Sequence, residues 1–115
     1  MHRVALVAFN GEQTCFVHVL LNALDMKKKG FEVRVVVEGS ATRLIPDLAR
    51  YDNPFNSLYA QVKRKGLFFA VCKACSSKMN VLEAVMGEGL TLADDMSGHP
   101  SLGEYIKDGY QIITF

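Results

Sequence analysis

Two uninterrupted apolar runs constrain the fold of this chain more than any other feature of its sequence. The first is Val4–Phe9 and the second is Leu67–Cys72, and polar or glycine residues flank both. A strand buried on one face alternates apolar and polar residues, whereas a strand covered on both faces reads as a continuous apolar run. The two runs therefore predict strands of a parallel sheet with helices on both of its faces.

The segment after the first run has the spacing of an amphipathic helix. Thr14 can cap this helix, Lys27–Lys29 complement its C-terminal dipole, and Gly30 can end it. Its apolar residues recur at helical intervals: Phe16, Val19, Leu20, Ala23 and Leu24. Val17 and Leu21 extend the apolar surface to a second face. We therefore expect this helix to contact both the sheet and another subunit.

The rest of the chain continues the alternation of strands and helices. The predicted strands lie over 31–37, 90–93 and 110–115. The predicted helices are one over 41–51 that is broken or kinked at Pro46, one from Pro54 to Lys65, and one from Cys75 to Gly87 or Gly89. A last helix is opened by Pro100, with Leu102, Tyr105 and Ile106 facing inward. This order predicts an α/β fold with a parallel sheet and right-handed crossovers. At 115 residues, we expect one domain, 1–115.

Cys72 and Cys75 lie where the second apolar run meets the next predicted helix. Reacting groups of open α/β sheets gather at the carboxyl ends of the strands. A helix N-terminus, together with Lys73 and Lys78, favours a nucleophilic thiolate there. We expect Cys75 to be the more accessible thiol and Cys72 to be partly enclosed. The alternative is that both cysteines only pack, as buried cysteines often do.

Composition excludes several classes of function. The chain has 13 basic and 12 acidic residues and a net charge of +1, which indicates neither a nucleic-acid nor a membrane partner. The lysine clusters at Lys27–Lys29 and Lys63–Lys65 both end predicted helices, and dipole complementation explains them. Three cysteines are too few for a secreted disulfide framework, and the first apolar run is too short for a signal peptide or a membrane span. We expect a cytoplasmic protein.

The sequence predicts no cofactor and no metal. The loop Asn10–Thr14 has one glycine and the acidic Glu12, so a plain turn is favoured over a phosphate-binding loop. Zinc needs about four ligands, and one Cys-x-x-Cys pair with His2, His18 and His99 scattered along the chain does not supply them. A metal site shared between subunits remains an alternative. Thioredoxin-type exchange fits the Cys-x-x-Cys spacing but not the order of elements.

The polar loop after the short strand is predicted at the same sheet edge as the thiols. Asp94, Asp95 and His99 can act there as acid or base groups, although a solvated loop with a helix cap is the favoured interpretation. Cys15, one residue after Thr14, is interpreted as a packing residue.

The chain resembles the DsrE/TusD-like sulfur-relay family of small flavodoxin-like proteins. The resemblance rests on the turn Phe9–Gly11 into a long helix, the strand Leu67–Val71 ending in cysteines, and the terminal strand Gly109–Ile113. It implies a three-layer α/β/α sandwich with a mostly parallel five-stranded sheet, assembly into a trimer or hexamer, and transport of sulfur as a cysteine persulfide. By position, the carrier would be Cys72 or Cys75.

Two functional hypotheses follow. The first is a cytoplasmic sulfur carrier or sulfurtransferase-like protein that exchanges sulfur with donor and acceptor proteins, with Cys75 accepting the sulfur and Cys72 resolving the persulfide. The alternative is a non-enzymatic α/β oligomer that binds a small ligand or a protein and whose cysteines only pack. Accessibility of the thiols in the folded protein distinguishes the two.

Overall fold

The two apolar runs form strands of one parallel sheet in the computed structural model, which describes residues 1–115. The strands are β1 (Arg3–Ala8), β2 (Glu32–Val37), β3 (Phe68–Cys72), β4 (Leu92–Ala93) and β5 (Gln111–Thr114). They lie in the order β4-β3-β2-β1-β5, and every neighbouring pair is parallel. The predicted α/β fold with a five-stranded parallel sheet is confirmed.

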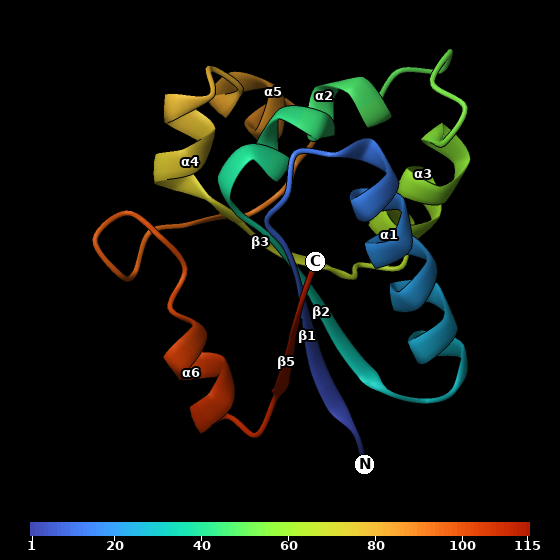
Figure 1. Cartoon of the computed structure of the whole chain (residues 1–115), viewed down its shortest axis with the longest axis vertical. Coiled ribbons are helices and arrows are strands. Elements are labelled where there is room, and N and C mark those ends of the chain that lie inside the picture. The colour runs from blue at the N-terminus through green and yellow to red at the C-terminus, as the bar shows by residue number, and fades with distance from the viewer.

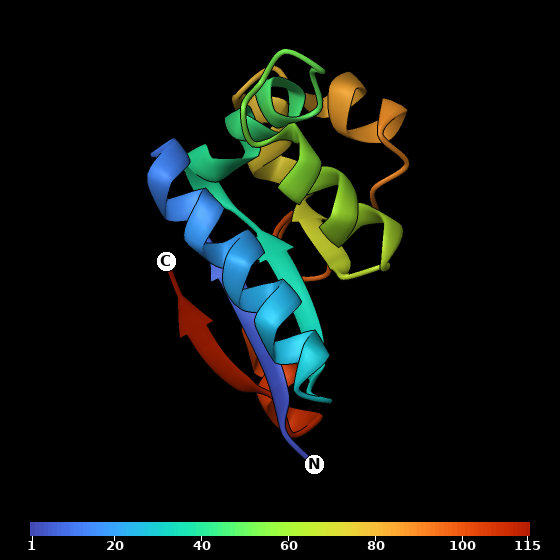
Figure 2. The ribbon, with the colours of Figure 1, turned by 90° about the vertical axis from the view of Figure 1, so that its right-hand side faces the viewer.

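Helices cover the two faces of the sheet unequally. They are α1 (Gln13–Lys28), the 3₁₀ helix η1 (Gly39–Arg43), α2 (Leu44–Leu48), α3 (Asn56–Arg64), α4 (Lys73–Lys78), α5 (Leu82–Gly87) and α6 (Leu102–Lys107). Figures 1 and 2 show α1 and α3 on one face, α6 alone on the other, and η1, α2, α4 and α5 beyond the carboxyl ends of the strands. None of these helices has the length and apolar character needed to cross a bilayer.

The main core lies between the sheet and α1 and α3. Leu6 and Val35 from the sheet pack there with Phe16, Leu20 and Val62 from the helices, all fully buried. The other face of the sheet carries Ala5, Val7 and Val36, which pack with Tyr105 of α6 and with Tyr110 in a smaller cluster. Alternate residues of continuous apolar strands thus enter different cores, as expected for a sheet with helices on both faces.

The second face is only partly covered because α6 is short. Phe69 of β3 is 42% exposed, so the expectation that the whole run Leu67–Cys72 is buried on both faces is wrong at this residue. The Arg34 guanidinium lies over the Phe69 ring at 3.9 Å from its centroid and over the Tyr110 ring at 4.3 Å. The Arg34 side chain thus covers aromatic surface that is not covered by a second helix.

Helix α1 forms as predicted but begins earlier than expected. Its N-cap is Glu12 rather than Thr14, and Glu12 makes no capping hydrogen bond with its side chain. Gly30 follows the helix at a φ of +86°, a conformation that glycine adopts without steric cost. On the predicted second apolar face, Val17 is buried within the chain, whereas Leu21 is 45% exposed.

Further helix predictions need correction. Pro46 does not break a helix, because it lies in the first turn of α2, where a missing amide donor costs nothing, and the change from 3₁₀ to α geometry comes earlier, between Arg43 and Leu44. Helix α3 begins at Asn56 rather than Pro54, after a turn in which the Asn53 side chain accepts a hydrogen bond from the Phe55 amide.

The third correction concerns the helix predicted to run from Cys75 to Gly87 or Gly89. Asn80 has a φ of +59°, and this left-handed residue separates α4 from α5. The Val81 amide then bonds the Ser76 carbonyl, which closes the end of α4. On α6, Tyr105 is buried as expected, but Ile106 is 61% exposed.

Candidate functional site

Cys72 ends β3 and caps α4 at the carboxyl edge of the sheet. Its side chain is completely buried. The Cys72 sulfur accepts a hydrogen bond from the Cys75 amide at 3.3 Å, and the Ser76 hydroxyl donates to the Cys72 carbonyl at 2.7 Å. The strand end and the first turn of α4 therefore hold this thiol in a fixed position.

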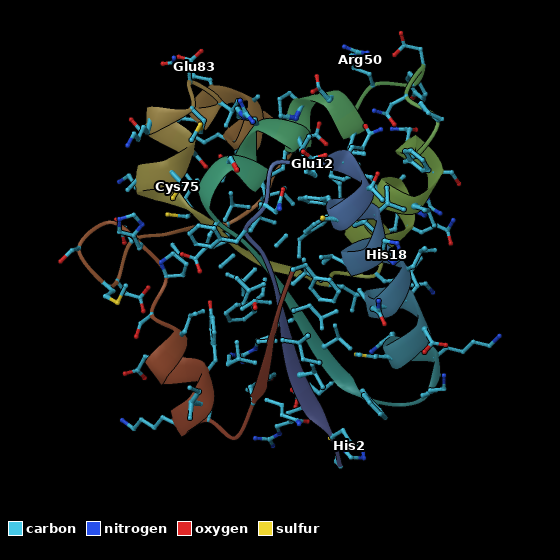
Figure 3. All side chains as sticks on the ribbon, in the orientation of Figure 1. His2, Glu12, His18, Arg50, Cys75 and Glu83 are labelled. Carbon is cyan, nitrogen blue, oxygen red and sulfur yellow. The ribbon has the colours of Figure 1, made fainter.

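Cys75 lies one turn further along α4, at the surface of the same edge (Figure 3). It is partly exposed, unlike Cys72, as the sequence predicted. Both cysteines are free thiols in the structure. Of the two, only Cys75 is open to a reagent from solution.

His99 approaches both thiols from a loop. Its Nδ1 atom is 3.0 Å from the Cys72 sulfur and 3.7 Å from the Cys75 sulfur. The loop is folded back by a tight turn in which Ser97 and Gly98 both have positive φ, and Met96 and His99 pair across it. The Ala74 amide also donates to the Gly98 carbonyl at 2.9 Å, which ties the loop to α4.

Burial dominates the electrostatics of the site. Burial, together with the Cys75 and Glu38 side chains, raises the pKa of the Cys72 thiol to about 12, while the hydrogen bond from the Cys75 amide opposes this rise. The expectation of a favoured thiolate is therefore wrong for Cys72. Burial also raises the pKa of Glu38, which follows β2 and is 6% exposed, while the nearby charge of His99 opposes that shift.

Comparison with known proteins identifies the family. The family model described as the DsrE/DsrF-like family matches residues 5–115. The chain belongs to the DsrE/DsrF-like family. An uncharacterised protein of Methanocaldococcus jannaschii is 42% identical to it over 96 residues, which span 84% of this chain and 76% of the relative. An uncharacterised protein of Archaeoglobus fulgidus is 30% identical over 40 residues, or 35% of this chain and 66% of the relative.

A solved structure extends the likeness to the three-dimensional fold. It is a conserved protein of unknown function from Bacteroides thetaiotaomicron, with a TM-score of 0.73 and 18% sequence identity. The match covers 98% of this DsrE/DsrF-like chain and 94% of the other chain. At this level of identity, the likeness concerns the fold.

The DsrE/DsrF-like chain brings together some of the predicted site residues and leaves others apart. Cys72, Cys75 and His99 form one cluster, whereas Asp94 pairs with Lys73 at 3.5 Å. Asp95 accepts a hydrogen bond from the Ser101 amide and so supports the start of α6 instead.

The remaining cysteine and histidines lie outside the cluster. Cys15 is partly exposed in the first turn of α1. His18 also lies on α1, and His2 lies at the opposite end of the sheet (Figure 3). In the loop before α1, the Asn10 side chain accepts a hydrogen bond from the Glu12 amide, which is the geometry of a plain turn.

Sequence reasoning missed Glu38 as a member of the site. The residue directly follows the strand next to β3 in the sheet, so its carboxylate faces the same edge as the cysteines. A polar residue after a β-branched strand was the available signal, but the same position also suits a helix cap.

Proposed function

We propose that this DsrE/DsrF-like protein is a cytoplasmic sulfur carrier or sulfurtransferase-like protein that holds a sulfane sulfur as a persulfide on Cys75. The observation that carries the proposal is the pairing of a partly exposed thiol with a fully buried one at the carboxyl edge of the sheet. A donor protein can reach Cys75, whereas Cys72 can react only with a group already held within the site. The sulfur chemistry implied by the family resemblance needs one accessible thiol, and Cys75 supplies it.

Loading begins with attack by the Cys75 thiolate on the outer sulfur of a donor persulfide. A new S–S bond forms at Cys75, the S–S bond of the donor breaks, and the donor leaves as a thiolate. A thiolate of an acceptor protein can then take the outer sulfur and regenerate the Cys75 thiolate. No external oxidant or reductant is needed in either transfer.

Cys72 provides a second route of release. Its thiolate attacks the Cys75 sulfur, the outer sulfur leaves as hydrosulfide, and an intramolecular disulfide remains. The Cys72 and Cys75 sulfur atoms lie within 4.8 Å of each other, so a small movement brings them into bonding range. His99 Nδ1, 3.0 Å from the Cys72 sulfur, is placed to accept the thiol proton.

Intact mass spectrometry after incubation with a sulfane sulfur donor tests this assignment. We expect the wild type to gain the mass of one sulfur, Cys75→Ser to gain none, and Cys72→Ser to gain it and keep it longer. Cys15→Ser is the matched control and should behave like the wild type. Uptake by Cys75→Ser but not by Cys72→Ser would reverse the two roles, and no uptake by the wild type from any donor would remove the proposal.

Alkylation of the native protein provides a second test. We expect iodoacetamide to modify Cys75 faster than Cys15, because Cys75 lies beside His99 and Lys78 follows it on the same helix. Peptide mass spectrometry at successive times measures the order. Equal and slow modification of all three cysteines would instead favour a protein whose cysteines only pack.

A further inference from the structure

Three side chains whose donor atoms bind soft metals converge at the carboxyl edge of β3. They are Cys72 at the strand end, Cys75 on α4 and His99 on the loop before α6, and their donor atoms all lie within 4.8 Å of one another. A metal site within one chain was not expected, because zinc needs about four ligands and the histidines are scattered along the sequence. The fold supplies a third ligand to the two cysteines, because the Ser97–Gly98 turn returns His99 to the thiols.

We propose that Cys72, Cys75 and His99 bind a thiophilic divalent cation of the Zn²⁺ type, with the fourth coordination position open. Two thiolates and one imidazole are a donor set that zinc uses in catalytic sites, where solvent or substrate fills the remaining position. This inference does not depend on the sulfur-carrier function.

The distances from His99 Nδ1 to the two sulfur atoms are close to those of tetrahedral coordination. Zinc–sulfur bonds of about 2.3 Å and zinc–nitrogen bonds of about 2.0 Å place sulfur and nitrogen ligands about 3.5 Å apart, and two sulfur ligands about 3.8 Å apart. The Cys75 sulfur lies 3.7 Å from His99 Nδ1, close to this value. The Cys72 sulfur, at 3.0 Å from the same nitrogen, must move away by about half an ångström to admit the ion.

The surroundings hold two of the ligands in place and leave the third accessible. Cys72 is fixed by the Cys75 amide and the strand end, and His99 is fixed by its pairing with Met96 and by the contact between Ala74 and Gly98. Cys75 is partly exposed, which provides an entry path from solution. Such preorganisation lowers the cost of ordering the ligands on binding.

The charges around the cluster favour a cation. The Glu38 carboxylate is 6% exposed and lies near enough to Cys72 and His99 to influence both electrostatically. Of the two lysines of α4, Lys73 is paired with Asp94, and Lys78 is the last residue of the helix, away from the Cys72 cap. Binding converts two thiols into two metal-bound thiolates and releases two protons, with no change of oxidation state.

Titration of the reduced full-length protein with Co²⁺ under anaerobic conditions tests the site directly. Thiolate ligands produce a sulfur-to-cobalt charge-transfer band in the near ultraviolet, which is a readout independent of sulfur transfer. We expect this band to saturate at one equivalent and to disappear when Zn²⁺ displaces Co²⁺. Cys75→Ala and His99→Ala should each weaken binding by tenfold or more, whereas Cys15→Ser and His18→Ala should bind as the wild type does.

Substitutions of the two partly exposed ligands carry the test, and Cys72, which is completely buried, is left unchanged. Circular dichroism of Cys75→Ala and His99→Ala verifies that both remain folded. Failure of the wild type to produce the charge-transfer band, or full-strength binding by folded His99→Ala, would overturn the proposal. Loss of the charge-transfer band in Cys15→Ser would also overturn the proposal.

The same variants separate this proposal from the sulfur-carrier function. Zn²⁺ should protect Cys75 of the wild type from alkylation, and His99→Ala should weaken this protection together with metal binding. Sulfur uptake without metal binding would remove the metal site alone. Metal binding without sulfur uptake from any donor would leave the metal site standing and remove the sulfur carrier.

Discussion

Ser76 shows how one buried hydroxyl supports the site. Its side chain is completely buried and donates to the Cys72 carbonyl at 2.7 Å. We expect Ser76→Ala to destabilise the protein by about 1 kcal/mol, the usual net value of such a hydrogen bond. Urea unfolding measures the change.

The neighbouring Ser77 provides the matched control for this substitution. It lies on the same helix but is exposed, so Ser77→Ala changes only helix propensity and should be neutral or slightly stabilising. Equal stability of the two variants would show that the buried hydrogen bond contributes nothing measurable.

At the level of single residues, the predictable part of the site is the part that local sequence determines. Cys72 and Cys75 follow an apolar strand, so their place at the sheet edge could be predicted from neighbouring residues alone. His99 could be placed at the same edge but not in contact, because its position depends on two positive-φ residues in the preceding turn. Glu38 became part of the site only through the pairing of β2 with β3.

Among the connecting elements, the turn before α6 is the one on which the site most depends. Gly98 has a φ of +91°, and a Cβ atom there would lie 3.1 Å from the Ala74 Cβ. We expect Gly98→Ala to destabilise the protein by about 1–3 kcal/mol, since the substitution adds backbone strain and crowds α4. Urea unfolding measures the loss, and the NMR signals of the His99 ring should shift as the loop moves away from the thiols.

Gly87 offers the control for this change. It lies at the end of α5, where an added Cβ would meet no atom within 4 Å. Gly87→Ala should therefore be neutral or stabilise by up to about 1 kcal/mol. If Gly98→Ala were as stable as Gly87→Ala, the turn would not hold His99 in the way described.

Two helices far apart in the sequence are joined by a carboxylate. Glu88, at the end of α5, accepts hydrogen bonds from the Tyr59 hydroxyl at 2.6 Å and from Lys63 of α3 at 3.1 Å. Partial burial raises the pKa of Glu88, but the two hydrogen-bond donors outweigh this effect and hold the pKa below its ordinary value.

This arrangement predicts a pH-dependent contribution to stability. Because the folded state lowers the pKa of Glu88, the contribution is complete above the unfolded value of about 4.3 and is lost as the pH falls below it. Between pH 7 and pH 3, the free energy of unfolding should therefore fall less in Glu88→Gln than in the wild type. The difference should be up to about 1 kcal/mol, because the Lys63–Glu88 pair is partly exposed. Urea unfolding at both pH values measures the difference, and Glu83→Gln, which alters an exposed carboxylate of α5, is the control. An unchanged pH profile in Glu88→Gln would contradict the prediction.

The elements that could be predicted are those with long periodic or continuous apolar patterns. β1, β2, β3 and α1 follow directly from such patterns. The split between α4 and α5 could not be predicted, because it depends on the left-handed conformation of Asn80, a residue that a helix also tolerates. The exposure of Phe69 could not be predicted for another reason. The sequence pattern does not show how much of a sheet face one short helix covers.

For the whole molecule, we expect a homo-oligomer, either a trimer or a hexamer, with α1 or its flanking loops in the interface. Large apolar side chains remain exposed on several elements, namely Leu21, Phe69, Ile106 and Ile113. Because Val17 is buried within the chain, Leu21 is the residue of the second α1 face that can meet another subunit. Light scattering measures the number of subunits, and Leu21→Glu should lower that number if α1 lies in the interface. A monomer alone at micromolar concentration would remove this prediction.

The complete burial of Cys72 makes this thiol a reporter of how the sheet opens. A thiol reagent can reach it only when the structure around the end of β3 opens, so the rate of modification under native conditions measures the free energy of that opening. β3 is linked to β2, and β2 to β1, by parallel pairing through the middle of the sheet. If the opening free energy at Cys72 equals the free energy of global unfolding, the sheet opens as one cooperative unit. If it is smaller, the edge formed by β3 and β4 opens on its own, and the protein exposes Cys72 without unfolding.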